Sequence, residues 1–406
     1  MEGVNLRCLC DAHCVPLRIN NDIVKDNLQR LIFKTMLTTE EILPFVKANR
    51  GKIQNYFYRK SVSYPLAKAL KNFQKHELNA LFLLTIETPM ELCKFFKTPI
   101  FQLEELINNP AYKNYTIRKK KGGERQIFVP EKRLKKIQKH LNYFLQAYYL
   151  MIKPKEVHGF VVNPHYFGTH CNILENAKAH TGKKFVLNID LKDFFPSISS
   201  MQVMHVFTSD YFGFNEQIAT ALTLLTTYES KLPIGSPASP VISNFICVQL
   251  DCDLKKFAEA NGLTYTRYAD DLTFSSDTNI SNDTVLYIIN QIKKNNFEVN
   301  KKKLRLKTAN RKQTVTGLTV NEKTNVDRKL LKKIRAMLYD LTKNGIDKAT
   351  QNHFNLKSEV EIRHKEKFIN RLGGYINFVG QVRGREDLLY IKQKSAFDAV
   401  FLPAEA

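Results

Sequence analysis

The stretch "RYADDLTFSS" at residues 267–276 places two aspartates side by side in a run whose other residues have the apolar and aromatic pattern of a buried hairpin. Adjacent like charges repel, and removing each from water costs roughly several kcal/mol unless a cation lies beside them. Three explanations are open from this stretch alone. An arginine neutralises the pair, a metal ion does so, or the turn is exposed and both aspartates are solvated.

The charge of the whole chain narrows the choice of partners. The chain has 406 residues, enough for two or three domains, and 62 Lys+Arg against 39 Asp+Glu give a net charge of +23. A solvated basic surface is one interpretation, but at this magnitude a polyanionic partner, most often nucleic acid, is favoured. No apolar run approaches the ~20 residues of a spanning helix, so we expect no contact with a membrane.

The first residues and the cysteines indicate the compartment. The start, "MEGVNLRCLCDAHCVPLRIN", lacks the layout of a signal peptide, and the seven cysteines show no framework spacing. Both features favour a reducing cytoplasm. A possible metal-ligand cluster near the start consists of Cys8, Cys10, His13 and Cys14. These residues lie too close together to complete a zinc tetrahedron without ligands from elsewhere, so we interpret the cysteines as reduced bystander thiols.

The sequence predicts several further elements. The first hundred residues have mostly helical spacing, and "YTIRKKKGGERQIFVP" predicts a basic hairpin with strands at 115–118 and 126–129. We expect helices within 131–150 and 200–231, a long helix that ends at Gly262, a helix at roughly 280–295, and two short strands within 297–320. From about residue 327 the chain reads as helical and basic, with a glycine-rich break at "RLGGYINFVGQVRG".

A third carboxylate lies in the strand predicted from "KKFVLNIDLKDFFPSI" (183–198). Phe185, Leu187, Ile189 and Leu191 alternate onto one face, and Val186, Asn188 and Asp190 onto the other. If this strand lies beside the hairpin, Asp190, Asp270 and Asp271 converge. Two Mg²⁺ ions about 4 Å apart would neutralise them, activate a 3′-hydroxyl and stabilise a leaving pyrophosphate. A metal site is therefore the favoured answer to the opening question.

Four motifs in order now resemble those of the reverse transcriptases. They are "DLKDFF" (190–195), "LPIGSPASPVISN" (232–244), "YADD" (268–271) and "NKKK" (300–303). Two shorter motifs, "NAKAH" (176–180) and "VTG" (315–317), resemble hallmarks of the reverse transcriptases of bacterial retrons. The resemblance covers roughly residues 110–320.

The resemblance implies a role for individual residues near the nucleotide. Asp190, Asp270 and Asp271 are the expected catalytic, metal-binding carboxylates. Phe195 matches the aromatic gate that rejects ribonucleotides, and Gly235 lies in the turn on which the base pair rests. The triphosphate is expected to bind Arg125 and one lysine of 119–121, Lys119 being the first, because arginine suits bidentate contacts to phosphate. Lys303 is a candidate acid for the leaving pyrophosphate.

The retron hallmarks imply residues that recognise RNA. The expected RNA-binding residues are Asn176, His180, Arg311, Lys312, Val315, Thr316 and Gly317. Two positions depart from the family pattern. Ile234 replaces a usual glutamine, which puts a polar contact to the sugar in doubt, and Leu304 replaces the usual threonine after the lysine run, which puts the role of Lys303 in doubt.

Retron kinship implies an α+β right-hand polymerase fold. Residues 1–105 are expected to form a helical extension that contacts RNA or forms an oligomer. Residues 106–170 are expected to form the fingers, with a further part of the fingers within 200–232. The palm with its antiparallel sheet is expected at 171–320 and a helical, RNA-binding thumb at 321–406. The implied activity uses dNTPs and two Mg²⁺ ions to copy part of a noncoding RNA into single-stranded DNA. Synthesis starts from an RNA 2′-hydroxyl and gives a branched RNA–DNA product, msDNA, which acts in anti-phage defence with an effector or toxin protein.

Two alternatives are open. One is another bacterial reverse transcriptase, from a group II intron or a non-retron defence system, although nothing in the chain resembles an intron-type endonuclease tail. The other is a nucleic-acid-binding scaffold that restrains an effector and makes no DNA. The intact set of three aspartates argues against the scaffold.

Overall fold

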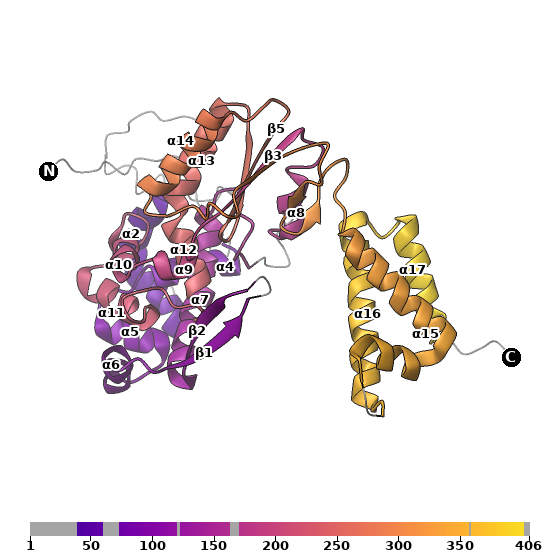
Figure 1. The fold of residues 1–406 in the computed structure, drawn as a ribbon. Coiled ribbons are helices and arrows are strands. Elements are labelled where there is room, and N and C mark those ends of the chain that lie inside the picture. Colours follow the sequence, from indigo (N-terminus) through magenta and orange to yellow (C-terminus); the bar gives the residue numbers. More distant parts are fainter. Residues whose placement is uncertain (1–38, 60–72, 120–121, 163–169, 357–358, 402–406) are drawn as a thin grey trace.

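The computed structural model describes residues 39–59, 73–119, 122–162, 170–356 and 359–401. The cysteine–histidine cluster at residues 8–14 and the lysines at 120 and 121 lie outside these ranges. In Figure 1 a large body of helices and strands is followed by a separate group of three C-terminal helices. Among the described residues, no helix is both long and apolar enough to cross a membrane.

The N-terminal helices share the core of the large body. They are α2 (Thr39–Arg59), α4 (Lys75–Leu83), α5 (Pro89–Phe96) and α6 (Ile100–Asn108). Thr88 and Glu91 form a capping box, and Pro89 occupies the first turn, so α5 begins there. Leu81, Leu83 and Leu92 are buried in one continuous hydrophobic cluster with residues of the central sheet. The described part of the predicted extension is therefore packed into the body, because its apolar residues need that core.

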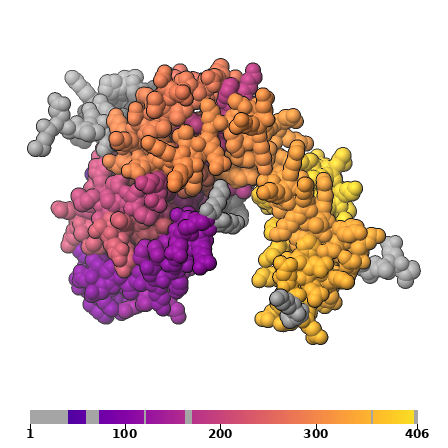
Figure 2. Space-filling view, in the orientation of Figure 1, coloured from indigo at the N-terminus to yellow at the C-terminus, as the bar shows by residue number. Residues whose placement is uncertain are grey.

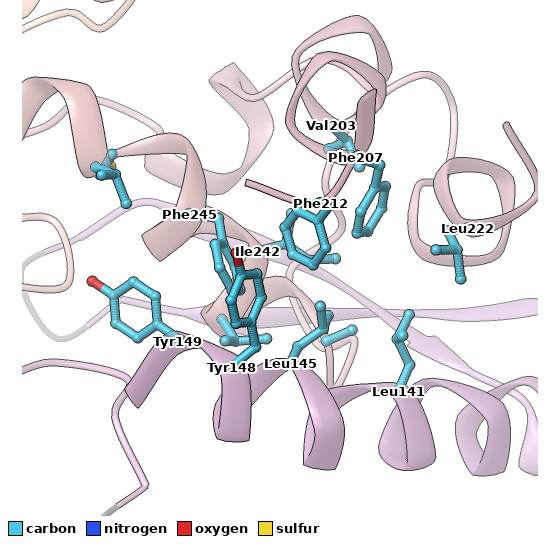
Figure 3. Close-up of a cluster of buried hydrophobic side chains, with 14 of the residues drawn as sticks. Leu141, Leu145, Tyr148, Tyr149, Val203, Phe207, Phe212, Leu222, Ile242 and Phe245 are labelled. Carbon is cyan, nitrogen blue, oxygen red and sulfur yellow. The ribbon is translucent and has the colours of Figure 1, made fainter. Parts of the chain in front are cut away.

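A two-stranded hairpin and a long helix follow. The strands β1 (Tyr112–Arg118) and β2 (Glu124–Pro130) pair antiparallel, with Ile117 opposite Arg125. Both strands are longer than the sequence predicted. Helix α7 (Lys132–Ile152) then buries Leu141, Leu145 and Tyr148. Figure 3 shows these side chains meeting aromatic and aliphatic residues from later parts of the chain, among them Phe207, Phe212 and Phe245.

The central sheet contains four antiparallel strands in the order β4-β5-β3-β6. They are β3 (Phe185–Asp190), β4 (Thr264–Tyr268), β5 (Asp271–Ser276) and β6 (Arg305–Thr308). The predicted alternation along β3 is confirmed, because Leu187 and Ile189 join the main core whereas Val186 joins a second cluster on the other face. A sheet with helices on it gives the α+β class that the sequence predicted.

The remaining helices of the body surround this sheet. They are α8 (Ile173–Lys178), α9 (Phe194–Ser197), α10 (Ser200–Thr208), α11 (Glu216–Thr226), α12 (Ser239–Ile246), α13 (Val248–Ala260) and α14 (Asn282–Lys294). The long helix expected before Gly262 is two helices that meet at Cys247. The segment after α14 carries the short hairpin β7 (Thr314–Val315) and β8 (Leu318–Thr319) in addition to β6, so it has one strand more than predicted.

The C-terminal unit consists of α15 (Arg328–Phe354, interrupted at Gly345), α16 (Ile362–Arg383) and α17 (Leu388–Asp398). The predicted glycine-rich break is wrong, because α16 continues through Gly373 and Gly380. A Cβ atom at Gly380 would lie 2.5 Å from the ring of Tyr390, so glycine there permits close packing of α16 on α17. In Figure 2 an open cleft separates this unit from the body below the region that joins them.

Candidate active site

The strand register brings the three predicted carboxylates to one edge of the sheet. Asp190 is the last residue of β3 and lies directly opposite Asp271, the first residue of β5. Asp270 occupies the turn between β4 and β5, and its carbonyl oxygen accepts a hydrogen bond from the Leu191 amide at 2.9 Å. The convergence that the sequence predicted is thus a consequence of antiparallel pairing between β3 and β5.

Desolvation and the charges of neighbouring carboxylates raise the pKa values of Asp270 and Asp271. Partial desolvation by the surrounding protein, together with the charges of Asp270 and Asp190, raises the pKa of Asp271 to about 6. The residue still has an exposed surface. Desolvation also raises the pKa of Asp270, with a contribution from Asp190. The edge of the sheet therefore carries more negative charge than its own surroundings compensate.

One lysine offsets part of this charge. Nζ of Lys303 lies 2.5 Å from Oδ1 of Asp190, and the amide of Asn300 donates to the Asp190 carbonyl at 2.8 Å. Lys303 lies in a turn just before β6. A role as an acid at the pyrophosphate requires Lys303 to leave Asp190.

The basic hairpin brings positive charge near the carboxylates, and the triphosphate clamp expected there stays a prediction. Arg125 is exposed on β2 and close enough for its charge to lower the pKa of Asp270. Lys119 is exposed just beyond β1, near the tip of the hairpin. Exposed cations beside a cluster of carboxylates can hold the phosphates of a nucleotide while the carboxylates hold its metal ions.

Gly235 joins the hairpin to the body. Its φ is 112°, and a Cβ atom there would lie 2.8 Å from Ile127 Cγ2 and 2.9 Å from the Phe128 carbonyl oxygen. The neighbouring Ile234 accepts a hydrogen bond from the Phe128 amide at 2.7 Å. Glycine is required here both by the positive φ and by the contact, and Ile234 connects to the hairpin through its main chain.

Phe195 lies in α9, five residues after Asp190 in the sequence. It is partly buried, with its ring centroid 5.4 Å from Phe194 and 5.6 Å from Phe160. Phe194 is buried in the core. Phe195 is therefore the member of this aromatic pair that retains a free surface for a substrate.

The residues present suit Mg²⁺ ions held jointly with a substrate. Among the described residues, no three acidic, histidine or cysteine side chains come close enough to form a ready metal-ligand cluster. Mg²⁺ commonly takes one or two carboxylates and completes its octahedron with water and substrate phosphates. The unrelieved negative charge at Asp270 and Asp271 is what a cation would neutralise, so these carboxylates fit that kind of site.

The raised pKa of Asp271 predicts a pH-dependent effect on stability without metal ions. Its folded pKa of about 6 lies above the ~3.9 of an unfolded aspartate, so its contribution to stability is present below ~3.9 and is lost as pH rises through 6. We expect the melting temperature of Asp271→Asn to rise relative to that of the wild type as pH increases from 5 to 7.5. The corresponding difference in the free energy of unfolding should stay below about 1 kcal/mol, because the side chain is solvated. Thermal unfolding in EDTA measures this, and a difference that stays constant with pH would contradict it.

The two segments expected to bind RNA pack against each other. Oγ1 of Thr316, at the tip of the β7–β8 hairpin, donates to the Ile173 carbonyl of α8 at 2.9 Å. The Gly182 amide donates to the Val320 carbonyl at the same distance. The "NAKAH" and "VTG" motifs, far apart in the sequence, therefore form one structural unit.

Several predicted RNA-binding side chains lie inside this unit. His180 is fully buried between Ser275 and Thr266, 2.7 Å from each hydroxyl, and burial lowers its pKa to about 3. Asn176 and Val315 are buried as well. A buried side chain cannot reach RNA directly, so for these three the structure corrects direct contact to a supporting position.

The exposed part of the unit is its hairpin tip and the loop before it. Thr316 has φ 47° and Gly317 φ 85°, and a Cβ atom on Gly317 would meet nothing within 4 Å. Arg311 is exposed, whereas the Lys312 ammonium forms an ion pair with Asp327 at 2.8 Å. Direct contact with RNA is thus available to Thr316, Gly317 and Arg311.

The sequence prediction missed a buried network beneath the aspartate turn. Arg267, the first residue of the stretch quoted above, forms an ion pair with Asp251 at 2.6 Å and does not neutralise Asp270 or Asp271. Its position in a run of apolar strand residues was the available signal. Gln313 was also missed, and its Nε2 donates to the carbonyls of Lys184 and Lys307.

Comparisons with known proteins show the family to which the chain is related. Residues 117–320, about half of the chain, match the family model for reverse transcriptases (RNA-dependent DNA polymerases). The chain is 36% identical over 238 residues to the retron Ec86 reverse transcriptase of Escherichia coli, a match covering 57% of this chain and 70% of that protein. It is 31% identical to the retron Ec73 enzyme of Escherichia coli (66% and 83% covered) and 31% to the retron Mx65 enzyme of Myxococcus xanthus (60% and 59%).

Proposed function

The chain belongs to the reverse transcriptases of bacterial retrons, RNA-directed DNA polymerases with a right-hand fold, and from this premise we propose that it copies part of one structured noncoding RNA into single-stranded DNA. Synthesis starts from a 2′-hydroxyl of that RNA and yields a branched RNA–DNA molecule. The observation that carries the proposal is that two sites lie on the same four-stranded sheet. Three carboxylates meet at one edge, and the unit of α8 and the β7–β8 hairpin packs on strands β4 and β5 through His180.

The residues of the chain divide the reaction among them. Asp190, Asp270 and Asp271 hold Mg²⁺, which when bound activates the attacking hydroxyl and stabilises the pyrophosphate. Arg125 and Lys119 bind the triphosphate and align it. Lys303 releases Asp190 and protonates the leaving pyrophosphate.

Recognition of the RNA falls to the unit of α8 and the β7–β8 hairpin. Thr316 is β-branched with a positive φ, a strained conformation that persists where surrounding contacts enforce it. Its hydrogen bond to Ile173 is such a contact, and it presents Gly317 to the outside. Small residues at a tip let an RNA backbone approach the main chain closely.

The basic C-terminal helices extend this surface toward the RNA. The first turns of helix α15 are rich in basic residues: Arg328, Lys329, Lys332, Lys333 and Arg335. Tyr339 is exposed on the same helix and can stack on an unpaired base. In the cytoplasm the branched product acts with an effector protein in defence against phage. A scaffold without catalysis finds no support in the site, since all three carboxylates are present.

The nucleic acid bound to the protein tests this proposal. We expect the chain, expressed with its own genomic neighbourhood, to co-purify with one RNA species covalently joined to DNA, and mass spectrometry of the same preparation to reveal the effector. The DNA part should be missing when Asp270→Asn is expressed instead. A heterogeneous mixture of cellular RNA without any RNA–DNA linkage would overturn the proposal.

Phe195→Ala is expected to admit ribonucleotides. Removing the half-buried ring opens space at the sugar 2′ position, and we expect selectivity for dNTP over NTP to fall by about tenfold or more, the scale of lost steric discrimination in a pocket. Single-nucleotide incorporation on a primed RNA template measures the ratio. Phe194→Leu is the matched control, since Phe194 faces the core, and it should leave the ratio unchanged. An unaltered ratio in Phe195→Ala would assign that ring to the core.

A further inference from the structure

A buried ion pair lies directly beneath the turn that carries two of the catalytic carboxylates. Arg267 is 0% exposed, and its Nε and Nη2 atoms donate to the two carboxylate oxygens of Asp251 at 2.7 and 2.6 Å. The Tyr265 hydroxyl donates to Asp251 at 2.8 Å. The remaining nitrogen of Arg267, Nη1, donates to Asn244 Oδ1 at 3.0 Å and to the Ala269 carbonyl at 3.2 Å.

The guanidinium therefore joins the body to the catalytic turn itself. Asp251 and Asn244 belong to α13 and α12, whose packing is fixed by the main core. Ala269 precedes Asp270 and has φ 59°, in the left-handed region that a non-glycine residue seldom adopts. A residue held there needs contacts that enforce the conformation, and the Arg267 hydrogen bond to its carbonyl is one of them.

The main chain of a neighbouring segment supports the same turn from another side. The Arg267 amide donates to the Glu156 carbonyl at 3.0 Å, and the His158 amide donates to the Arg267 carbonyl at 2.9 Å. These bonds place Gly159 so close to the turn that a Cβ atom on it would lie 2.3 Å from the Ala269 amide nitrogen. The Gly159 carbonyl in turn accepts from Asn244 Nδ2 at 3.0 Å, which closes the network.

The chemistry of the pair suits positioning better than stability. Two buried charges are costly to remove from water, and replacing such a pair by apolar residues of similar volume is often neutral or stabilising. Their benefit is geometric, because the planar guanidinium offers donors in a fixed fork that can bind Asp251, Asn244 and Ala269 together. A lysine ammonium has no such fork.

We propose that Arg267, held by Asp251 and Asn244, is a positioning residue that fixes the left-handed turn at Ala269 and thereby aims Asp270 and Asp271 at Asp190. The inference rests on the assignment of these three aspartates as the metal-binding carboxylates. It predicts that the affinity of the site for divalent metal ions, and not only the rate, depends on a residue that touches neither metal nor substrate.

The main test replaces the pair with apolar residues. The triple variant Asp251→Leu, Tyr265→Phe, Arg267→Met removes the charges together with the hydroxyl that would otherwise lose its partner. Asn244 Oδ1 and the Ala269 carbonyl lose their Arg267 donor in this variant, so we expect the melting temperature to fall while the protein remains folded at 25 °C. We expect Mn²⁺ affinity, measured by electron paramagnetic resonance without nucleic acid, to fall about fivefold or more, and hydrogen exchange at the Leu191 amide, which donates to Asp270, to speed up.

A neighbouring ion pair provides the control. Lys255 of α13 lies 3.4 Å from Glu156, and Lys255→Met, which keeps Glu156 in place, should leave Mn²⁺ affinity and Leu191 exchange unchanged. A folded triple variant with Mn²⁺ affinity and exchange equal to wild type would overturn the proposal. Failure of the metal assignment itself is separable, because Asp270→Asn would then bind Mn²⁺ as well as wild type does.

A second pair of variants keeps the test informative if the triple variant does not fold. Arg267→Lys should weaken Mn²⁺ binding because lysine cannot hold Ala269 through a fork. Adding Ala269→Gly to it should restore at least half of the lost affinity, since glycine adopts a positive φ without restraint. A purely structural role for Arg267 predicts the opposite, that the added glycine lowers stability further and restores no binding.

Discussion

Asp270→Asn is expected to abolish DNA synthesis while RNA binding stays within about twofold of wild type. A neutral amide cannot replace a carboxylate between two Mg²⁺ ions, and loss of one metal-ligating charge commonly reduces rates by several orders of magnitude. The change removes one negative charge from a chain with a net charge of +23, so the attraction to an RNA backbone hardly alters. Primer extension and filter retention of RNA should be measured on the same preparation.

The chain offers a matched control for this charge change. Asp277 lies just beyond the other end of β5, exposed and paired with Lys183 at 2.7 Å. Asp277→Asn alters the net charge by the same amount at the opposite end of β5 from the catalytic turn, and it should leave extension within about twofold. Extension by Asp270→Asn within tenfold of wild type would contradict the metal assignment.

Short local patterns were enough to predict that Asp190 and the Asp270–Asp271 turn meet at one edge of the sheet. The alternation along 185–191 predicts which side of β3 carries Asp190, and an adjacent hairpin strand can pair with it in only a few registers. The observed partner of Asp190 is Asp271, so the local reasoning reached the correct edge of the sheet. Antiparallel pairing between β3 and β5 therefore determines which carboxylates lie close together.

The partner of Arg267 could not be predicted in the same way. Arg267 is in the stretch that raised the question of a cation, yet its side chain lies with Tyr265 on the face of β4 that meets α13. Asp251 is separated from it by 16 residues and a helix end, and nothing local in the sequence indicates how α13 rotates over the sheet. Side-chain direction across a helix–sheet contact is a property of the packed core.

The burial of His180 has the same origin. The "NAKAH" motif indicates that α8 matters, but a helix of six residues gives too little periodicity to show which side faces inward. Its ring lies between hydroxyls of Thr266 on β4 and Ser275 on β5, two strands that follow it in the chain by more than eighty residues. The break predicted in the glycine-rich stretch of α16 was wrong for a similar reason, since Gly373 and Gly380 lie against Phe397 and Tyr390 of α17, further along the chain.

Gly317→Asn is expected to cost about tenfold or more in DNA synthesis on the native noncoding RNA, and to leave extension of a generic DNA primer on an RNA template within about twofold. The main chain at Gly317 is open, because a Cβ atom there meets nothing within 4 Å, so a side chain can be added without a clash inside the protein. Asparagine tolerates positive φ better than other side chains, which limits the strain at φ 85°. What the added side chain obstructs is the close approach of an RNA backbone.

The chain again contains a matched control. Gly262 ends α13 with φ 64°, is exposed, and has open space around its own hypothetical Cβ atom. Gly262→Asn therefore imposes the same kind of backbone strain at a site outside the α8–hairpin unit, and it should leave both activities near wild type. Melting temperatures should fall by no more than about 2–4 °C in either variant. If Gly317→Asn lowers both activities equally and its melting temperature drops well beyond that of Gly262→Asn, the glycine serves the turn alone and the RNA is recognised elsewhere.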